Sequence, residues 1–142
     1  MNKVFLDTDV LLDIFLEREP HHTTALRLLT VLRQKGTACY TSPLVLANMN
    51  YLLSKAKGRD YALGRLRSLR RMVDVAPIGQ TTVDNALSTP HRDLEDSLQM
   101  YCALENGIQT LVTRNVKDYP KGKVLIVDPN QYLSTKALEG KG

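Results

Sequence analysis

Short apolar runs alternate with helix-spaced apolar residues along nearly the whole chain. Parallel strands need a long crossover between them, usually a helix, so this alternation indicates a mostly parallel sheet with helices on both faces. We therefore predict an α/β protein with three layers, α/β/α, around a central sheet. The expected strands cover residues 3–6, 37–40, 73–78, 109–113 and 123–127.

The expected helices are recognised by their ends as well as by their spacing. Ser42-Pro43 combines a favourable N-cap with proline at the first helical position, and Asn106-Gly107 supplies the exit of a later helix. Residues 115–118 are expected to form a single turn. The helical patterns cover residues 10–15, 21–36, 43–57, 61–72, 81–87 and 93–106, and a last one begins at residue 128.

The chain has 142 residues, which fits one domain with a hydrophobic core. We predict a single domain over residues 1–133 and a flexible tail over residues 134–142. No apolar run approaches the roughly 18–20 residues that a membrane span needs, so we expect a cytoplasmic protein without membrane contact. Cys39 and Cys102 lack the spacing of a metal or redox pair, and buried reduced thiols are expected.

The charge of the chain favours an anionic partner, because the net charge is +4 and the isoelectric point is near 9.1. Basic surfaces are common, so charge alone does not establish nucleic-acid binding. The helix expected at 61–72 has a basic exterior, which suits phosphates or an acidic partner segment, and a solvated helix face explains it equally well. Its basic residues are Arg65, Arg67, Arg70 and Arg71.

Acidic and polar side chains follow two of the expected strands at the point where each strand ends. Asp7 and Asp9 follow the first strand, and Thr113 and Asp118 follow the fourth. In parallel sheets ligands collect at the carboxyl ends of strands, where groups distant in sequence can meet. Taken alone, Asp7 is as readily explained as the N-cap of the next helix.

A third pair of acids, Asp93 and Asp96, opens the helix expected at 93–106. Acids in a first helical turn suit the helix dipole, which accounts well for Asp93. Asp96 has the apolar neighbours Leu94, Leu98 and Met100, and a carboxylate in such surroundings more often has a partner or a metal. Three segments that each bring an acid to one sheet edge indicate a shared site. Oxygen ligands without His or Cys indicate Mg²⁺ or Mn²⁺ rather than zinc.

Four stretches, taken in their order along the chain, resemble the PIN domain family, and the resemblance spans residues 3 to about 133. It implies a PIN-like fold and a metal-dependent endoribonuclease, which in bacteria is often the toxin of a VapBC-type toxin–antitoxin pair. It also implies an RNA substrate, an antitoxin protein as partner and a homodimer. The stretches are Val4 to Asp13, the helix opened by Ser42-Pro43, Asp93-Leu94-Glu95-Asp96, and Thr113 to Tyr119.

The resemblance also implies roles for individual residues. In the family's mechanism the ions position and activate a water for in-line attack on a phosphodiester. Asp9 stands where the family usually has Asn or Asp. Independently of the resemblance, we expect Arg114 and the four arginines of 61–72 to contact RNA because of their charge. Asp7, Asp96 and Asp118 match the catalytic, metal-binding acids, and Asp93, Thr113 and Asn115 match positions that support them.

The sequence departs from the family at Asn48, where a glutamate is usual. A neutral amide can ligate Mg²⁺ but removes one negative charge, which Asp9 or Glu95 could restore. The alternative is a non-catalytic PIN-like module that binds RNA or protein. A second alternative is a haloacid-dehalogenase-like phosphatase, because Asp7-Thr8-Asp9-Val10 after an apolar strand resembles the nucleophile motif of that family. His91 is expected on a surface loop.

Overall fold

The structure, a computed structural model, describes residues 2–89 and 93–141, with side chains as far as residue 135. Its described strands alternate with helices, as the sequence predicts. The strands are β1 (Lys3–Leu6), β2 (Ala38–Thr41), β3 (Asp74–Val75), β4 (Thr110–Val112) and β5 (Leu125–Val127). The helices are α1 (Thr8–Phe15), α2 (His21–Gln34), α3 (Pro43–Lys57), α4 (Arg59–Met72), α5 (Gln80–Ser88), α6 (Leu94–Glu105) and α7 (Pro129–Lys141), with a 3₁₀ turn η1 (Val116–Asp118).

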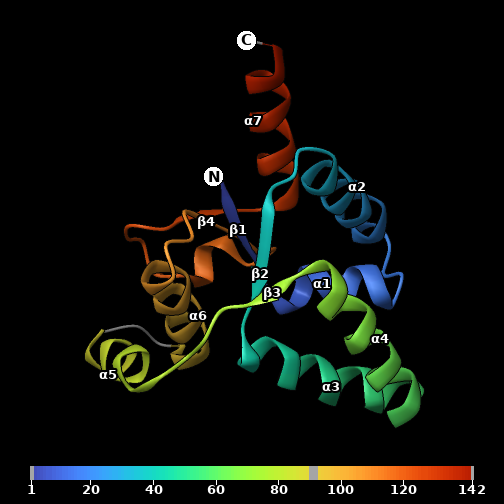
Figure 1. The fold of residues 1–142 in the computed structure, drawn as a ribbon, viewed down its shortest axis with the longest axis horizontal. Coiled ribbons are helices and arrows are strands. Elements are labelled where there is room, and N and C mark those ends of the chain that lie inside the picture. The colour runs from blue at the N-terminus through green and yellow to red at the C-terminus, as the bar shows by residue number, and fades with distance from the viewer. Residues whose placement is uncertain (1, 90–92, 142) are drawn as a thin grey trace.

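The strands form one sheet in the order β3-β2-β1-β4-β5, and every pair of described neighbours is parallel. Helices α5 and α6 lie on the opposite side of the sheet from α1 and α2 (Figure 1). This arrangement confirms the predicted three-layer α/β/α fold. No described helix is both long enough and apolar enough to span a membrane.

The order of the strands creates a reversal point between β1 and β4. The chain builds outward from β1 through β2 to β3, and then returns to the other side of β1 for β4 and β5. In doubly wound sheets the crevice at the carboxyl ends of the two strands on either side of such a reversal is the usual ligand site. Here those ends carry Asp7 and Thr113.

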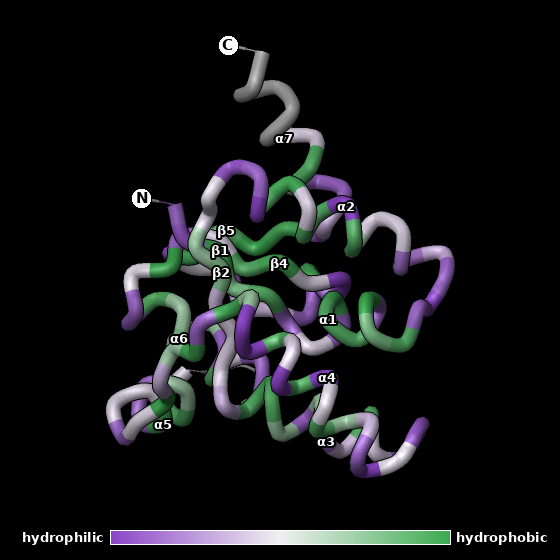
Figure 2. The backbone as a smooth tube through the Cα atoms, turned by 45° about the vertical axis from the view of Figure 1, so that its right-hand side comes forward, coloured by the Kyte–Doolittle hydropathy of each residue, from purple (hydrophilic) through white to green (hydrophobic). Residues whose placement is uncertain are grey.

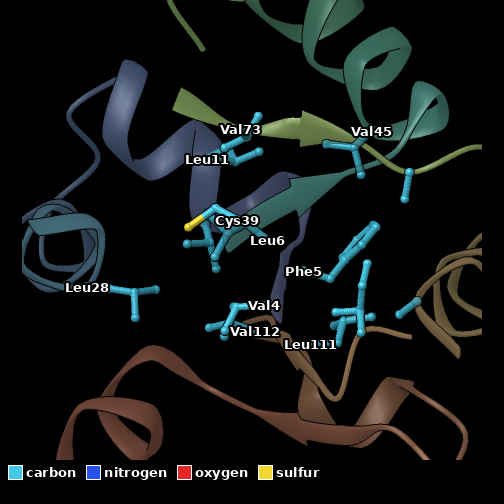
Figure 3. Packing of buried hydrophobic residues seen from close by; sticks show 14 of the residues in the cluster. Val4, Phe5, Leu6, Leu11, Leu28, Cys39, Val45, Val73, Leu111 and Val112 are labelled. Carbon is cyan, nitrogen blue, oxygen red and sulfur yellow. The ribbon is translucent and has the colours of Figure 1, made fainter. Parts of the chain in front are cut away.

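The core lies on both faces of the two central strands. Val4, Phe5 and Leu6 of β1 are at most 2% exposed, and Leu111 and Val112 of β4 are fully buried. Figure 3 shows these side chains packed toward residues of the covering helices, and in Figure 2 the central strands lie in a largely green, hydrophobic part of the tube. A strand buried on both faces explains why these runs are continuously apolar instead of alternating.

Two elements differ in extent from the sequence prediction. β3 covers two residues instead of the expected 73–78, because Ala76 makes the last backbone bond to β2, from its N–H to the Thr41 carbonyl, and Pro77 has no N–H to extend the ladder. α7 is helical as far as Lys141, through most of the segment for which a flexible tail is predicted. The flexibility of that segment stays a prediction.

Both cysteines are free and buried, as the sequence predicts. Burial raises the pKa of Cys39 to about 11 and that of Cys102 to about 12, so both thiols stay protonated at neutral pH.

Candidate active site

Asp7 lies at the reversal point, directly after β1, and uses its two carboxylate oxygens differently. Oδ1 accepts the backbone N–H of Thr8 at 2.8 Å and caps α1. Oδ2 accepts the hydroxyl of Thr113 at 3.0 Å and the phenol of Tyr119 at 2.7 Å. The predicted capping role is therefore present, and it leaves Oδ2 to contact residues that follow β4. Burial raises the pKa of Asp7, and these three hydrogen bonds oppose that rise.

Asp9 lies in the first turn of α1 and faces the segment that follows β4. Its Oδ2 accepts the hydroxyl of Thr113 at 3.3 Å, the backbone N–H of Arg114 at 3.0 Å and the amide of Asn115 at 3.1 Å. Its Oδ1 is buried and has no hydrogen-bond partner among the described residues. Burial, and then repulsion from Asp7, raise the pKa of Asp9 to about 6. Thr113 thus contacts both Asp7 and Asp9, and Asn115 contacts Asp9, while their supporting role in a site stays a prediction.

The start of α6 contributes the second group of acids. The Asp93 carboxylate caps the helix by accepting the backbone N–H of Asp96 at 3.2 Å, as expected for an acid at this position. Burial raises the pKa of Asp96 to about 7, and repulsion from Asp93, Asp7, Glu95 and Asp118 adds to the rise. Asp7, which follows β1, and Asp118 of η1 thus both act on Asp96 at the start of α6. The role of these three acids as metal ligands stays a prediction.

Asn48 lies against the same group. Its amide donates to Oε1 of Glu95 at 2.6 Å. Burial, and then repulsion from Asp93 and Asp7, raise the pKa of Glu95, whereas the bond from Asn48 lowers it. The family usually has a glutamate at position 48, and Asn48 instead holds the carboxylate of Glu95 beside that position.

A buried contact fixes the position of α3 relative to α6 and so brings Asn48 to Glu95. The Ser42 hydroxyl accepts the backbone N–H of Val45 as the N-cap of α3, and it donates to Oε1 of Gln99 at 2.6 Å. Ser42 and Gln99 are at most 1% exposed. The two helices are therefore joined by one buried and one more exposed hydrogen bond.

The donor chemistry of these acids fits a hard divalent cation. The set is oxygen only, its other carboxylates raise the pKa of Asp96, and it includes the buried Oδ1 of Asp9, which has no hydrogen-bond partner among the described residues. Among the residues that the structure describes, however, no three His, Cys, Asp or Glu side chains are grouped closely enough to hold an ion as they lie. The case for a cation therefore rests on charge and donor type, not on a formed cage.

Asp13 is a buried acid beside the candidate site that the sequence reasoning did not single out. It is 1% exposed and pairs with two arginines: Arg18 Nε lies 2.9 Å from Oδ1, and Arg114 Nε lies 2.7 Å from Oδ2. Arg114 adds a second bond, from Nη2 to Oδ1 at 3.3 Å. The available signal was an acid inside a helix that is apolar on all sides, since such an acid is buried and needs a cationic partner.

Tyr119 is the other residue that was missed as a contributor to the site. It is 4% exposed, and its phenol bonds to Asp7. Burial and the neighbouring Asp7 charge raise its pKa, so it remains a donor. Its sequence neighbours Asp118, Pro120 and Lys121 give no local sign of this burial, and only the structure shows that the buried phenol has found a partner.

The arginines assigned to RNA contact have different environments. Those of α4 are exposed, and in the described part of the chain none of them forms an ion pair with Asp7, Asp9 or Asp96. Arg70 pairs with Asp74 at 3.7 Å, and the guanidinium carbon of Arg65 lies 4.9 Å from the ring centre of Tyr61. The guanidinium of Arg114 is engaged by Asp13, which gives it a structural role. Their contact with RNA stays a prediction. His91 lies outside the described residues.

Comparisons with known proteins agree on one family. A sequence model of the PIN domain matches residues 3–117. A curated relative, ribonuclease VapC1 of Aquifex aeolicus (strain VF5), is 27% identical over 122 residues, which cover 82% of this chain and 84% of the relative.

Solved structures with low sequence identity share the fold. VapBC2 of Rickettsia felis, bound to a DNA fragment from their promoter, aligns with a TM-score of 0.68 at 18% identity, covering 87% of this chain and 96% of that chain. VapC20 of Mycobacterium tuberculosis, a toxin that cleaves the sarcin–ricin loop, aligns with a TM-score of 0.62 at 22% identity, covering 76% of this chain and 86% of that chain. A toxin–antitoxin complex from Klebsiella pneumoniae aligns with a TM-score of 0.67 at 21% identity, covering 89% of this chain and 97% of that chain.

Proposed function

The chain belongs to the PIN domain family, and we propose that it is a metal-dependent endoribonuclease that acts as the toxin of a toxin–antitoxin pair. One observation carries the proposal: Asp7, which follows β1, and Asp118 of η1 both raise the pKa of Asp96 at the start of α6, beside the reversal point of the sheet. The curated relative is named a ribonuclease, which supports the same activity. Membership of this family replaces the haloacid-dehalogenase alternative, which left the Thr113 segment unexplained.

Asp7, Asp96 and Asp118 are the acids that would hold the ion, Mg²⁺ or Mn²⁺. The bound ion would supply an activated water and neutralise charge on the phosphodiester. The protein's own contribution is to fix the carboxylates in advance. Thr113 and Tyr119 hold Oδ2 of Asp7, so that carboxylate keeps its orientation when a substrate arrives.

We assign the charge that Asn48 lacks to Glu95. The amide of Asn48 donates to Glu95 and so orients a carboxylate whose pKa already responds to Asp7. Where the family usually has a glutamate on α3, this chain therefore carries the fourth negative charge, beside those of the three metal-binding acids, on α6. The non-catalytic alternative rests on the same residue. Asn48 can offer a metal only its neutral amide oxygen, while its amide N–H donates to Glu95.

The activity is tested with single-stranded and structured RNA in Mn²⁺. We expect Asp7→Asn to abolish cleavage, because it removes a charge at the reversal point of the sheet while keeping the side chain's shape. Asp84→Asn is the matched control, since Asp84 is an exposed acid on α5. Equal cleavage by wild type and Asp7→Asn would refute the assignment. Absence of any Mn²⁺-dependent heat in calorimetry would favour the non-catalytic module.

The proposed partners are an antitoxin protein and a second copy of the chain. The Klebsiella pneumoniae neighbour is a toxin–antitoxin complex, which supports the antitoxin. The homodimer is supported by exposed apolar side chains on α3, where Tyr51 is 65% and Leu52 39% exposed. Light scattering of wild type and Tyr51→Asp tests the dimer. An RNA substrate places the proposed activity in the cytoplasm.

A further inference from the structure

A basic cavity lies between η1 and β5, on the segment that connects β4 to β5. Its volume is about 780 Å³, within the range of roughly 300–1,000 Å³ that is usual for small-ligand sites. Tyr119 lines the cavity, and the same side chain donates to Oδ2 of Asp7. The cavity therefore shares a wall with the candidate active site without using its acids.

The lining of this cavity carries an excess of positive charge. Lys117, Lys121 and Lys123 line it and are exposed, and none of them forms an ion pair with a carboxylate in the described part of the chain. Asp128 also lines the cavity, and Arg114 is already paired with Asp13. Three ammonium groups against the single carboxylate of Asp128 leave a positive excess beside an acid-rich site, which suits the phosphates of a nucleic-acid backbone.

The rest of the lining is apolar. Leu125 of β5 is 60% exposed, and Val116 and Ile126 are half-buried in the same lining. A solvated basic loop accounts for the lysines but leaves this exposed apolar surface without a reason. A nucleotide in single-stranded RNA presents both an apolar base face and a charged phosphate, so it matches the two parts of the cavity.

We propose that the cavity between η1 and β5 binds a nucleotide of single-stranded RNA next to the phosphodiester that is cut. This inference rests on the ribonuclease function proposed above and adds a substrate-binding site to it. The lysines contact the phosphates, and Leu125 and its neighbours contact the base. Substrate that is single-stranded next to the cleavage point is preferred, because a paired base cannot enter the cavity.

The test measures binding of a fluorescein-labelled 12-nucleotide single-stranded RNA to the full chain carrying Asp7→Asn, so that cleavage does not interfere. We expect Lys121→Gln with Lys123→Gln to weaken binding roughly tenfold and to lower the salt slope by about 1.4, since each phosphate contact on a single strand contributes about 0.7. The control is Lys55→Gln with Lys57→Gln on α3, which removes the same charge, and its affinity should change less than about twofold.

A third variant separates the apolar contact from the charge. Leu125→Ser should weaken binding without changing the salt slope, because it removes apolar surface and no cation. Thermal unfolding by circular dichroism verifies that each variant is folded. We expect all of them to fold, because the substituted lysine and leucine side chains are exposed. If the cavity variants bind RNA as tightly as the α3 control, the proposal is overturned. The same result is expected if the cavity binds an acidic protein segment instead of RNA.

The two proposals fail in different ways. In the wild-type background the cavity variants should raise KM for single-stranded RNA and leave kcat nearly unchanged, because the acids are untouched. Cleavage that depends on Asp7 but not on the lysines refutes the cavity alone. Cleavage that is the same with and without Asp7 refutes the ribonuclease assignment, and the binding measurement still decides whether RNA enters the cavity.

Discussion

Asp13 is held between two arginines that come from different parts of the chain. Arg18 is five residues away, whereas Arg114 is 101 residues away and follows β4. The Arg114 backbone N–H binds Asp9, so the Asp13 pair also fixes the segment that supports the site. Sequence reasoning identified Asp9 and Thr113 because each follows a strand, but it could not supply the Arg114 pairing, which depends on how far α1 lies from β4 in space.

Asp13→Asn should lower the free energy of unfolding by about 2 kcal/mol. The change leaves Arg114 and Arg18 without a charged partner, and the cost is below that of a fully buried pair because the arginines are 30% and 40% exposed. Urea denaturation measures it. Asp74→Asn, which breaks the exposed pair with Arg70, should cost less than about 0.5 kcal/mol. Equal effects of the two changes would contradict the role of Asp13.

Glu95→Gln should weaken Mn²⁺ binding at least roughly tenfold if Glu95 supplies the charge that Asn48 lacks, because it removes one anionic donor from the set. Isothermal calorimetry with Mn²⁺ measures the affinity directly, without reference to cleavage. Asp84→Asn is again the control for loss of an acid elsewhere. An unchanged Mn²⁺ affinity in Glu95→Gln would show that Glu95 does not bind the ion and serves only as an acid in the first turn of α6.

At the scale of elements, the sequence predicted the types and order of the helices and strands but not their mutual positions. Ser42-Pro43 marks the start of α3 and Asp93 the start of α6, because caps are local signals. The bond from Ser42 to Gln99 that places these helices together joins residues 57 positions apart and has no local signal. The proximity of Asn48 to Glu95 follows from that contact and could not be predicted before it.

Ser42→Ala should lower the free energy of unfolding by about 2 kcal/mol, because it removes the N-cap of α3 and leaves Gln99 Oε1 without its partner in a buried position. Chemical denaturation gives the loss. Ser68→Ala, which removes only a bond to the Gly64 carbonyl within α4, should change stability by less than about 0.5 kcal/mol. A weaker Mn²⁺ affinity in Ser42→Ala alone would link this contact to the position of Glu95.

At the scale of the whole molecule, the alternation of strands and helices was enough to predict a parallel sheet, yet it did not fix the strand order. The position of β1 between β2 and β4 sets the reversal point, and that point decides which strand ends meet. The continuous burial of Phe5 and its neighbours is consistent with a central strand, but the same run would suit any buried strand. Topology, which is a property of the assembled sheet, is therefore what brings acids that are scattered in the sequence to one candidate site.

The assembled acids should also make the stability of the protein fall as pH rises from about 4 to 7. The pKa of Asp9 is raised to about 6 and that of Asp96 to about 7, so between the unfolded value of 3.8 and these values the unfolded chain binds fewer protons than the folded one. The free energy of unfolding therefore decreases across this range and levels off above it. Urea denaturation at a series of pH values measures the slope, and Asp96→Asn should reduce it.

Mn²⁺ should reverse this loss, because a cation binds the ionised carboxylates and only the folded state brings them together. The rise in Tm on adding Mn²⁺ should therefore be larger at pH 7.5 than at pH 5, where protons compete for Asp9 and Asp96. Asp7→Asn should diminish the rise at pH 7.5, and Asp84→Asn should leave it unchanged. A Tm that responds equally to Mn²⁺ at both pH values would mean that the ion binds elsewhere on the molecule.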